Sequence, residues 1–197
     1  MGRDKALVQF ASQPMVAHAL ETLRQAGLSP SIAGGQAELA AFAPLVPDIN
    51  PGLGPLGGIC AALASTSAQL AVFLPVDLPL LPTSLVLCLL RHAAISGNAV
   101  TLPSINGFTQ TFPAVLNRSL APLLERELAT GNRGCFSAFQ AVAAAIAQSM
   151  SVLPVEILVQ SGQVSHPQSL PASRWFLNVN SEEELRWATV HSRARIA

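Results

Sequence analysis

The sequence predicts an α/β sandwich in which helices cover both faces of a sheet. Strand-like apolar segments alternate along the chain with segments of helical periodicity, as in folds of this class. The most apolar segment, residues 70–76, ends at Asp77 and is followed by Pro79 and Pro82, which is typical of a strand buried on both faces in the middle of a parallel sheet. Since no segment of the 197 residues resembles a linker, we expect one domain over residues 1–197.

Apolar spacing and glycine positions predict the elements of the first third. Residues 15, 16, 19, 20 and 23 are apolar at helical spacing, so a helix is expected over residues 14–26 with Gly27 as its C-cap. Residues 48–58 are rich in glycine and proline, which predicts a loop leading into a helix over 59–65. The other expected elements are a short apolar piece at 6–10, a strand at 31–33, a turn at Gly34-Gly35, a short helix at 36–42 and a strand at 45–46.

Two local patterns organise the rest of the chain. Asn106-Gly107, between apolar segments, predicts a β-hairpin. Ser181, with Glu184 three residues later, predicts a capping box at the start of the last helix. The remaining expected elements are helices over 83–96, 117–130 and 135–148, and strands over 152–159 and 175–179.

The composition argues against several classes of function. Eleven basic and eleven acidic residues cancel without a run of one sign, which argues against a nucleic-acid or anionic-membrane surface and favours a small-molecule partner. Residues 70–90 have the length of a membrane span but contain Asp77 and three prolines, and the polar start is followed by no signal-peptide core, so we expect a cytoplasmic protein. Only 11% of the residues are charged, which makes self-association plausible on a neutral surface.

Cysteine and histidine show no metal-binding or disulfide pattern. Cys60, Cys88 and Cys135 are widely spaced in apolar neighbourhoods, so we expect reduced thiols in the core and no zinc site. The four histidines have no metal-ligand spacing and are expected to be packed or on the surface. Lys5 is the single lysine and Asp77 is one of three aspartates, which makes both stand out as candidate site residues.

Gly52, Gly54 and Gly57 form a G-x-G-x-x-G pattern before a helix, and Asp77 follows where the ribose-binding acid of a dinucleotide fold would lie. Several prolines precede the pattern in place of a good strand, and Pro55 lies inside it, so the dinucleotide interpretation is the weaker one. The alternative is a tight loop-to-helix turn that packs closely on the sheet and offers its backbone to a phosphate or a base.

Four motifs follow one another over nearly the whole chain. They are M-G-R-D-K-A-L at the start, G-L-G-P-L-G-G-I-C-A-A-L from residue 52, A-V-F-L-P-V-D-L-P-L-L-P from residue 71 and F-L-N-V-N-S-E-E-E-L from residue 176. In this order and spacing the sequence resembles the molybdenum cofactor guanylyltransferase family, which is similar in turn to the wider nucleotidyltransferases. The resemblance implies a Rossmann-like three-layer sandwich with a mostly parallel sheet.

The resemblance also implies an activity: transfer of GMP from GTP to the terminal phosphate of molybdopterin, with release of pyrophosphate and a requirement for Mg²⁺. GTP and molybdopterin are then the small-molecule partners, and self-association or contact with a molybdoenzyme-maturation protein is possible. The residues that match the family's functional positions are Lys5 and Asp77 for catalysis and nucleotide binding, Asp77 also as metal ligand, Asp48 and Gly54 for the nucleotide, and Asn178 and Asn180 for the acceptor. Arg133 is a further candidate for the pterin phosphate.

Each of these residues has a purely structural alternative. Aspartate is a common turn residue, and asparagine commonly starts helices. The alternatives are a turn-capping role for Asp77, a solvated side chain for Lys5 and Arg133, an Asx turn at Asp48, a positive φ at Gly54, and, for the N-x-N motif, the start of the last helix at Asn180 and Ser181.

The sequence departs from the family pattern at three places. The family has a strand and an L-A-G-G-x-S-x-R loop directly before M-G-x-D-K, whereas this sequence starts at that methionine. A missing strand would leave a gap between neighbouring strands with unpaired backbone groups. S-I-A-G-G replaces Ser-Ala-Asn after the second strand, and T-Q-T-F-P-A replaces a turn containing His-Pro, so base and acceptor are less securely predicted. The alternatives are a nucleotidyltransferase with another acceptor, such as a phosphosugar, and a truncated non-catalytic relative that binds a partner through its apolar surface.

Overall fold

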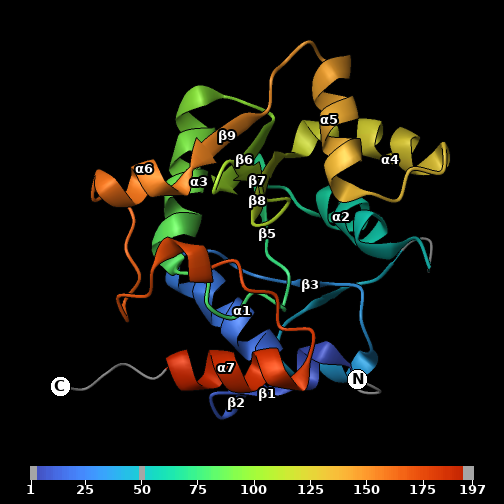
Figure 1. Ribbon diagram of the computed structural model, residues 1–197. Coiled ribbons are helices and arrows are strands. Elements are labelled where there is room, and N and C mark those ends of the chain that lie inside the picture. The colour runs from blue at the N-terminus through green and yellow to red at the C-terminus, as the bar shows by residue number, and fades with distance from the viewer. Residues whose placement is uncertain (1–3, 49–51, 193–197) are drawn as a thin grey trace.

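A mixed sheet forms the centre of the molecule, and helices cover both of its faces (Figure 1). The structure is a computed structural model that describes residues 4–48 and 52–192. The five-stranded sheet has the order β5-β8-β6-β7, and β9 also pairs with β6. Its strands are β5 (Leu70–Phe73), β6 (Val100–Ile105), β7 (Phe108–Thr109), β8 (Ala114–Asn117) and β9 (Ser151–Pro154). A separate parallel pair is formed by β3 (Ile32–Ala33) and β4 (Leu45–Val46).

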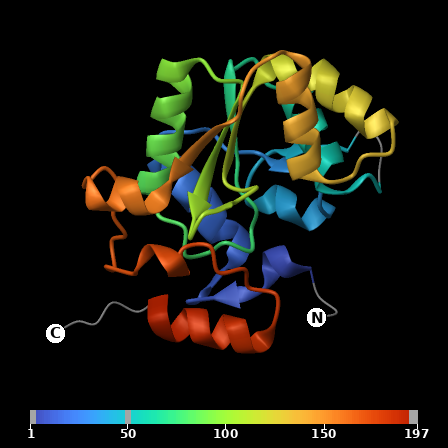
Figure 2. The same ribbon diagram turned by 45° about the horizontal axis from the view of Figure 1, so that its top comes forward.

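Helices lie on opposite faces of the sheet (Figure 2), and two hydrophobic clusters join them to it. Val115 and Leu116 are neighbours on β8, yet each belongs to a different cluster, because successive side chains of a strand point to opposite faces. The helices of the Leu116 cluster are α2 (Gly54–Ser65), α4 (Ala121–Ala129) and α5 (Cys135–Ala145). Those of the Val115 cluster are α1 (Met15–Gln25), α3 (Thr83–Ser96) and α6 (Val155–Gln160). The three-layer α/β fold predicted from the sequence is thus confirmed.

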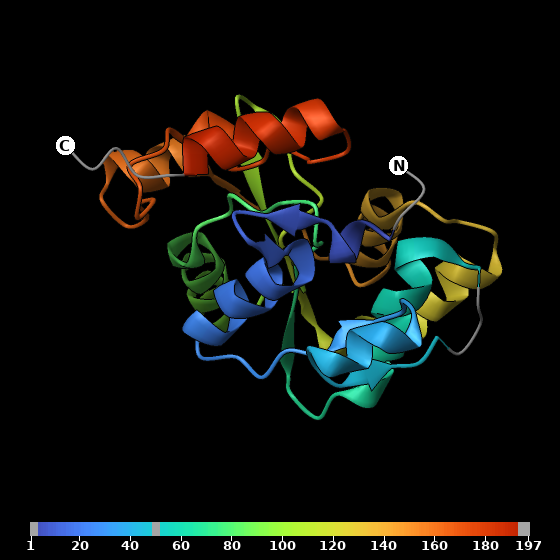
Figure 3. The same cartoon turned by 90° about the horizontal axis from the view of Figure 1, so that it is seen from below.

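The first and last parts of the described chain lie side by side, as Figure 3 shows from below. A hairpin of β1 (Gln9–Phe10) and β2 (Gln13–Pro14) packs against α7 (Glu182–Ser192). Phe10, Met15 and Ala188 share one buried cluster at this contact. A 3₁₀ helix, Lys5–Leu7, precedes β1, so the N-terminal segment lies next to the start of α7.

Several elements lie where local sequence patterns predicted them. Helix α3 spans the expected residues, and Gly97 follows it at φ +69°, as expected for a C-cap glycine. The β6–β7 hairpin turns at Asn106 and Gly107, with φ values of +53° and +78°. No helix among the described residues is long and apolar enough to cross a membrane.

The segment expected in the middle of a parallel sheet lies at its edge. β5 ends at Phe73, pairs with β8 in antiparallel fashion, and its residues are half-buried rather than buried. The sheet is more antiparallel than expected, because β8 runs against both of its neighbours; β6–β9 is its parallel pair.

Other element limits differ from the prediction for reasons that involve proline or tertiary packing. The strand expected over 152–159 ends at Pro154, which lacks an N–H for the ladder, and Val155 begins α6. Residues 175–179 form no strand; Trp175 is buried in the cluster of α3 and β8, and its indole N–H donates to the Leu170 carbonyl at 2.9 Å. The helix expected from 117 begins at Ala121, after β8 and a 3₁₀ turn.

Candidate functional site

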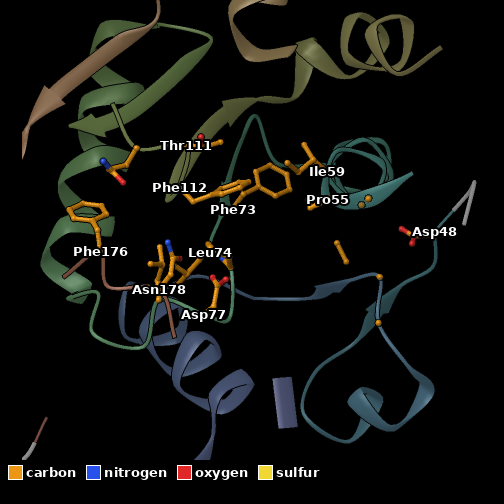
Figure 4. A pocket seen from close by; sticks show the side chains of 18 of the residues that line it. Asp48, Pro55, Ile59, Phe73, Leu74, Asp77, Thr111, Phe112, Phe176 and Asn178 are labelled. Atoms are coloured by element: carbon orange, nitrogen blue, oxygen red, sulfur yellow. The ribbon is translucent and has the colours of Figure 1, made fainter. Parts of the chain in front are cut away.

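A cavity of about 770 Å³ opens where β3 and β5 end (Figure 4). Its walls come from the turn after β3, the turn after β5, the first turn of α2, the segment before β8 and the segment before α7. Ligands of open α/β sheets bind at the carboxyl ends of strands. The position of this cavity therefore makes it the candidate site.

Asp77 lies in the turn after β5, and its side chain lines the cavity (Figure 4). It is half-buried, and no described residue donates a hydrogen bond to its carboxylate. Its backbone carbonyl accepts from the Val179 N–H at 3.0 Å, which ties the C-terminal segment to this turn. Asn178 consequently lies on the same side of the cavity as Asp77.

Asp48 lies on the opposite side of the cavity (Figure 4). Its Oδ1 atom is buried and has no hydrogen-bond partner among the described residues. Gly34 makes room for the other oxygen, because a Cβ atom at Gly34 would lie 3.4 Å from Asp48 Oδ2. A buried acceptor without a donor is costly, so the site is suited to a ligand that brings N–H groups to Asp48.

The first turn of α2 faces the cavity with its backbone. Gly54 begins the helix at φ +69°, Pro55 occupies the first turn, and no described side chain caps the helix end. The sequence G-P-L-G-G is therefore helical, and the expected loop is shorter than predicted. A Cβ atom at Gly58 would lie 3.4 Å from Ala33 Cβ, so this glycine serves the close packing of α2 on β3.

Lys5 and Asn180 are joined beside the cavity but do not line it. Lys5 Nζ donates to Asn180 Oδ1 at 2.5 Å. Glu184 Oε2 accepts from the backbone N–H groups of Asn180 and Ser181, each at 2.8 Å, which confirms the capping box. The hydrogen bond from the Asn180 N–H lowers the pKa of Glu184 most, and the hydrogen bond from the Ser181 hydroxyl follows. The charge of Lys5 adds to the lowering. Glu184 thus holds the segment that carries Asn178 and Asn180.

Comparison with known proteins decides the family. The model of the MobA-like NTP transferase domain matches residues 1–149. A molybdenum cofactor guanylyltransferase from Pseudomonas putida is 35% identical over 136 residues, which cover 67% of this chain and 71% of that protein. The chain belongs to the MobA-like NTP transferase family. Its resemblance to the guanylyltransferases, predicted from four motifs, is confirmed.

Solved structures show that the nucleotidyltransferase fold is shared more widely. Molybdopterin-guanine dinucleotide biosynthesis protein A from Archaeoglobus fulgidus superposes with a TM-score of 0.75 at 19% identity, over 96% of this chain and 90% of that one. The 2-C-methyl-D-erythritol 4-phosphate cytidylyltransferase from Thermus thermophilus superposes with a TM-score of 0.67 at 13% identity, over 96% and 94% of the two chains. At these identities the likeness shows the fold alone.

The donors present in this MobA-like chain fit a metal that is shared with a substrate. No cluster of three or more acidic, cysteine or histidine side chains within residues 4–48 and 52–192 could enclose a metal by itself. Asp77 offers one carboxylate that no described residue engages, inside a cavity that has room for further ligands. Mg²⁺ is commonly held in this way, by one or two carboxylates together with substrate phosphates and water.

Arg133 lies away from this site. It lines a second cavity of about 450 Å³ together with Cys60 and Glu125, and its guanidinium donates to the Leu128 carbonyl at 2.6 Å. Burial raises the pKa of the Cys60 thiol to about 11. All three cysteines are free, but only Cys60 is buried as expected, and Cys88 and Cys135 are half-buried.

No pattern in the sequence indicated several of the residues that line the first cavity. Gln110, Thr111 and Phe112 enter it from the segment before β8, and Phe176 enters from the segment before α7 (Figure 4). The resemblance had marked the 110–112 segment only as a departure from the family. A glycine-proline pair at a helix start is the local signal that would have placed α2 correctly.

Proposed function

We propose that this protein transfers GMP from GTP to molybdopterin and releases pyrophosphate, with Mg²⁺ as cofactor. The observation that carries the proposal is the unengaged Asp77 carboxylate, which faces the unpartnered Asp48 oxygen across one cavity at the ends of β3 and β5. Family membership supports nucleotidyl transfer, and the names of the relatives support the two substrates.

The reaction requires positioning more than covalent catalysis. An acceptor phosphate oxygen attacks the α-phosphorus in line with the departing pyrophosphate, so the protein must align two anions and offset their charge. In our proposal Asp77 holds Mg²⁺, which neutralises charge on the triphosphate when bound. Lys5 supplies a cationic point charge next to the Asn178–Asn180 segment, and its hydrogen bond to Asn180 holds it at the edge of the cavity.

Asp48 is proposed to select the base. Its carboxylate, whose Oδ1 atom is buried without a described partner, can accept from the N1 and N2 hydrogens of guanine, which adenine does not present in this arrangement. Gly34 keeps the space beside the carboxylate open. The backbone around Gly54, at the uncapped start of α2, is the proposed second contact to the nucleotide.

The acceptor is proposed to enter from the side of Asn178. Phe112 and Phe176 line this part of the cavity and offer apolar surface to a planar ring, while Asn178 offers an amide (Figure 4). Asn180 acts through Lys5 in this proposal, because it does not line the cavity.

The test is Mg²⁺-dependent pyrophosphate release by the Asp77→Asn variant with GTP and molybdopterin. We expect turnover to fall roughly a hundredfold or more, since a metal ligand that acts on developing charge contributes several kcal/mol. Glu21→Gln, a substitution on the exposed side of α1, is the control and should leave turnover unchanged. Normal turnover in Asp77→Asn would refute the assignment of Asp77.

The same assay separates the alternative functions. Replacing molybdopterin by a panel of phosphosugars tests a different acceptor, and replacing GTP by CTP tests the base. If the wild type releases pyrophosphate with none of these pairs, a non-catalytic binding role replaces the proposed enzyme.

A further inference from the structure

Gln110 lines the 770 Å³ cavity from the segment between β7 and β8, and it is half-buried there. Thr111, the next residue, lies on the side of the cavity that holds Phe176 and Asn178 (Figure 4). Asp48 lies on the other side. Gln110 therefore belongs to the part of the cavity in which the acceptor is proposed to bind, away from the proposed position of the guanine base.

The backbone of Gln110 is held by the central sheet. Its N–H donates to the carbonyl of Pro103 on β6 at 2.8 Å. This hydrogen bond extends the β6–β7 hairpin by one step beyond the pair of Ser104 and Thr109. A binding residue that is fixed to a sheet is positioned more precisely than one on a free loop.

The side-chain amide of Gln110 has one defined orientation. Its Nε2 atom donates to the Phe108 carbonyl at 3.1 Å. A carbonyl oxygen can only accept, so the NH₂ end of the amide must face it and the oxygen must lie at the other end. No described residue donates a hydrogen bond to Oε1. Gln110 thus keeps one free acceptor oxygen in a fixed orientation at the cavity wall.

Aromatic side chains surround this acceptor. Phe112 and Phe176 line the same side of the cavity and offer apolar ring surface to a flat ligand (Figure 4). A free acceptor next to such surfaces favours a ring that carries N–H donors on its edge. A flat nitrogen heterocycle meets both conditions, whereas the saturated ring of a sugar is not flat.

We propose that Gln110 determines the acceptor specificity of this protein. Its Oε1 atom accepts a hydrogen bond from an N–H group on the edge of a flat nitrogen heterocycle, which lies against Phe112 and Phe176. This inference rests on the proposed function, because it concerns the acceptor of the same reaction. It assigns recognition of the pterin ring to one side chain, which favours a pterin over a phosphosugar.

Binding of two pteridines measures this contact without turnover. The first, 6-hydroxymethylpterin, carries N–H groups on one ring edge, and the second, 1,3-dimethyllumazine, has the same fused rings but no N–H group. By fluorescence titration, the wild type should bind the pterin about 3- to 10-fold more tightly, as expected for one hydrogen bond between neutral groups. Gln110→Met keeps the length of the side chain but removes the amide, so this preference should fall to about twofold or less.

Gln140→Met, on the exposed side of α5, is the matched control and should keep the preference of the wild type. In turnover with GTP and molybdopterin, Gln110→Met should raise KM for molybdopterin about 3- to 10-fold, with KM for GTP and kcat nearly unchanged. A structural role of Gln110 would lower kcat and the unfolding midpoint together, so the midpoints of both variants are measured as well.

Three results would overturn the inference. One is a wild type that binds the two pteridines equally, or neither at millimolar concentration. Another is a Gln110→Met variant that keeps the full preference for the pterin. The third is weaker GTP binding by Gln110→Met, because Gln110 would then belong to the nucleotide side. Failure of the proposed function would show differently, as a wild type that releases no pyrophosphate with GTP and molybdopterin; the pteridine titrations need no turnover and still decide the role of Gln110.

Discussion

Asp48→Asn separates a ligand-binding role of this residue from a structural one. The substitution keeps the shape of the side chain but removes its charge and turns one acceptor oxygen into a donor. In the free protein the buried Oδ1 atom has no described donor, so the substitution breaks no described hydrogen bond. In the proposed complex the substitution removes a charge-assisted acceptor for the guanine N–H groups. It also places the NH₂ group of the asparagine against a guanine N–H, so that two donors face each other.

A ligand-binding role and a structural role of Asp48 predict different effects of Asp48→Asn on GTP affinity and on stability. The sizes below are those expected for the ligand-binding role. A hydrogen bond to a charged group contributes about 1.5 to 3 kcal/mol, so Asp48→Asn should weaken GTP binding about 10- to 150-fold. ATP binding should change little, so the preference for GTP falls by the same factor. The free energy of unfolding should stay constant or rise by up to about 1 kcal/mol, because a partly buried charge without a partner is removed.

Two titrations distinguish the ligand-binding role of Asp48 from the structural one. Isothermal titration calorimetry gives Kd for GTP and ATP, and urea unfolding gives the stability of the free protein. Glu38→Gln, on the exposed 3₁₀ helix of the same region, is the control and should alter neither quantity. Unchanged GTP affinity combined with a loss of stability would refute our reasoning and support the Asx turn as the role of Asp48.

Two further predictions concern packing and pH. Gly58→Val should destabilise the fold by about 1 to 3 kcal/mol, because its side chain would be forced against Ala33 at the contact of α2 with β3; urea unfolding checks this against Ala64→Val on the exposed side of α2. Glu184→Gln should lower the unfolding midpoint at pH 7 relative to Glu183→Gln. Since the folded-state pKa of Glu184 is lowered, its contribution is present above the pKa of the unfolded state and is lost as the pH falls through the folded value. The two midpoints should therefore converge in acid, and a difference that persists at strongly acidic pH, below the folded value, would contradict this account.

Local sequence patterns predicted the elements whose limits depend on local chemistry. The hairpin at Asn106-Gly107, the end of α3 at Gly97 and the capping box of Ser181 and Glu184 all follow from side-chain or φ preferences of a few neighbouring residues. Such preferences act wherever the segment lies in the fold. They are therefore visible in a sequence without knowledge of the tertiary structure.

The elements that were predicted wrongly depend on distant partners. Residues 175–179 have the apolar content of a strand, but Trp175 fills a place in a cluster with Leu85 and Val115, and the segment remains irregular. The apolar run that ends at Asp77 was predicted in the middle of the sheet, because a continuous run of apolar residues suggests a strand that is buried on both faces. Nothing in seven apolar residues shows on how many sides a strand is paired.

The same distinction applies to the candidate site. Asp48, Gly54, Asp77 and Asn178 surround one cavity, as a common function would require, although they come from four segments of the chain. The resemblance to a family supplied this grouping, since spacing alone could not. Lys5 was expected in the same site, and its contact with Asn180 beside the cavity depends on the packing of the first segment against α7.

The end of β5 and the segment that follows it form part of the candidate site. Phe73, Leu74 and Pro75 line its cavity, and Asp77 lies two residues after Pro75. The turn that carries Asp77 is held on one side by the pairing of β5 with β8 and on the other by the Val179 N–H. Since a carboxylate holds a metal well only when it is positioned, these two contacts bear on the metal-binding role that we propose for Asp77.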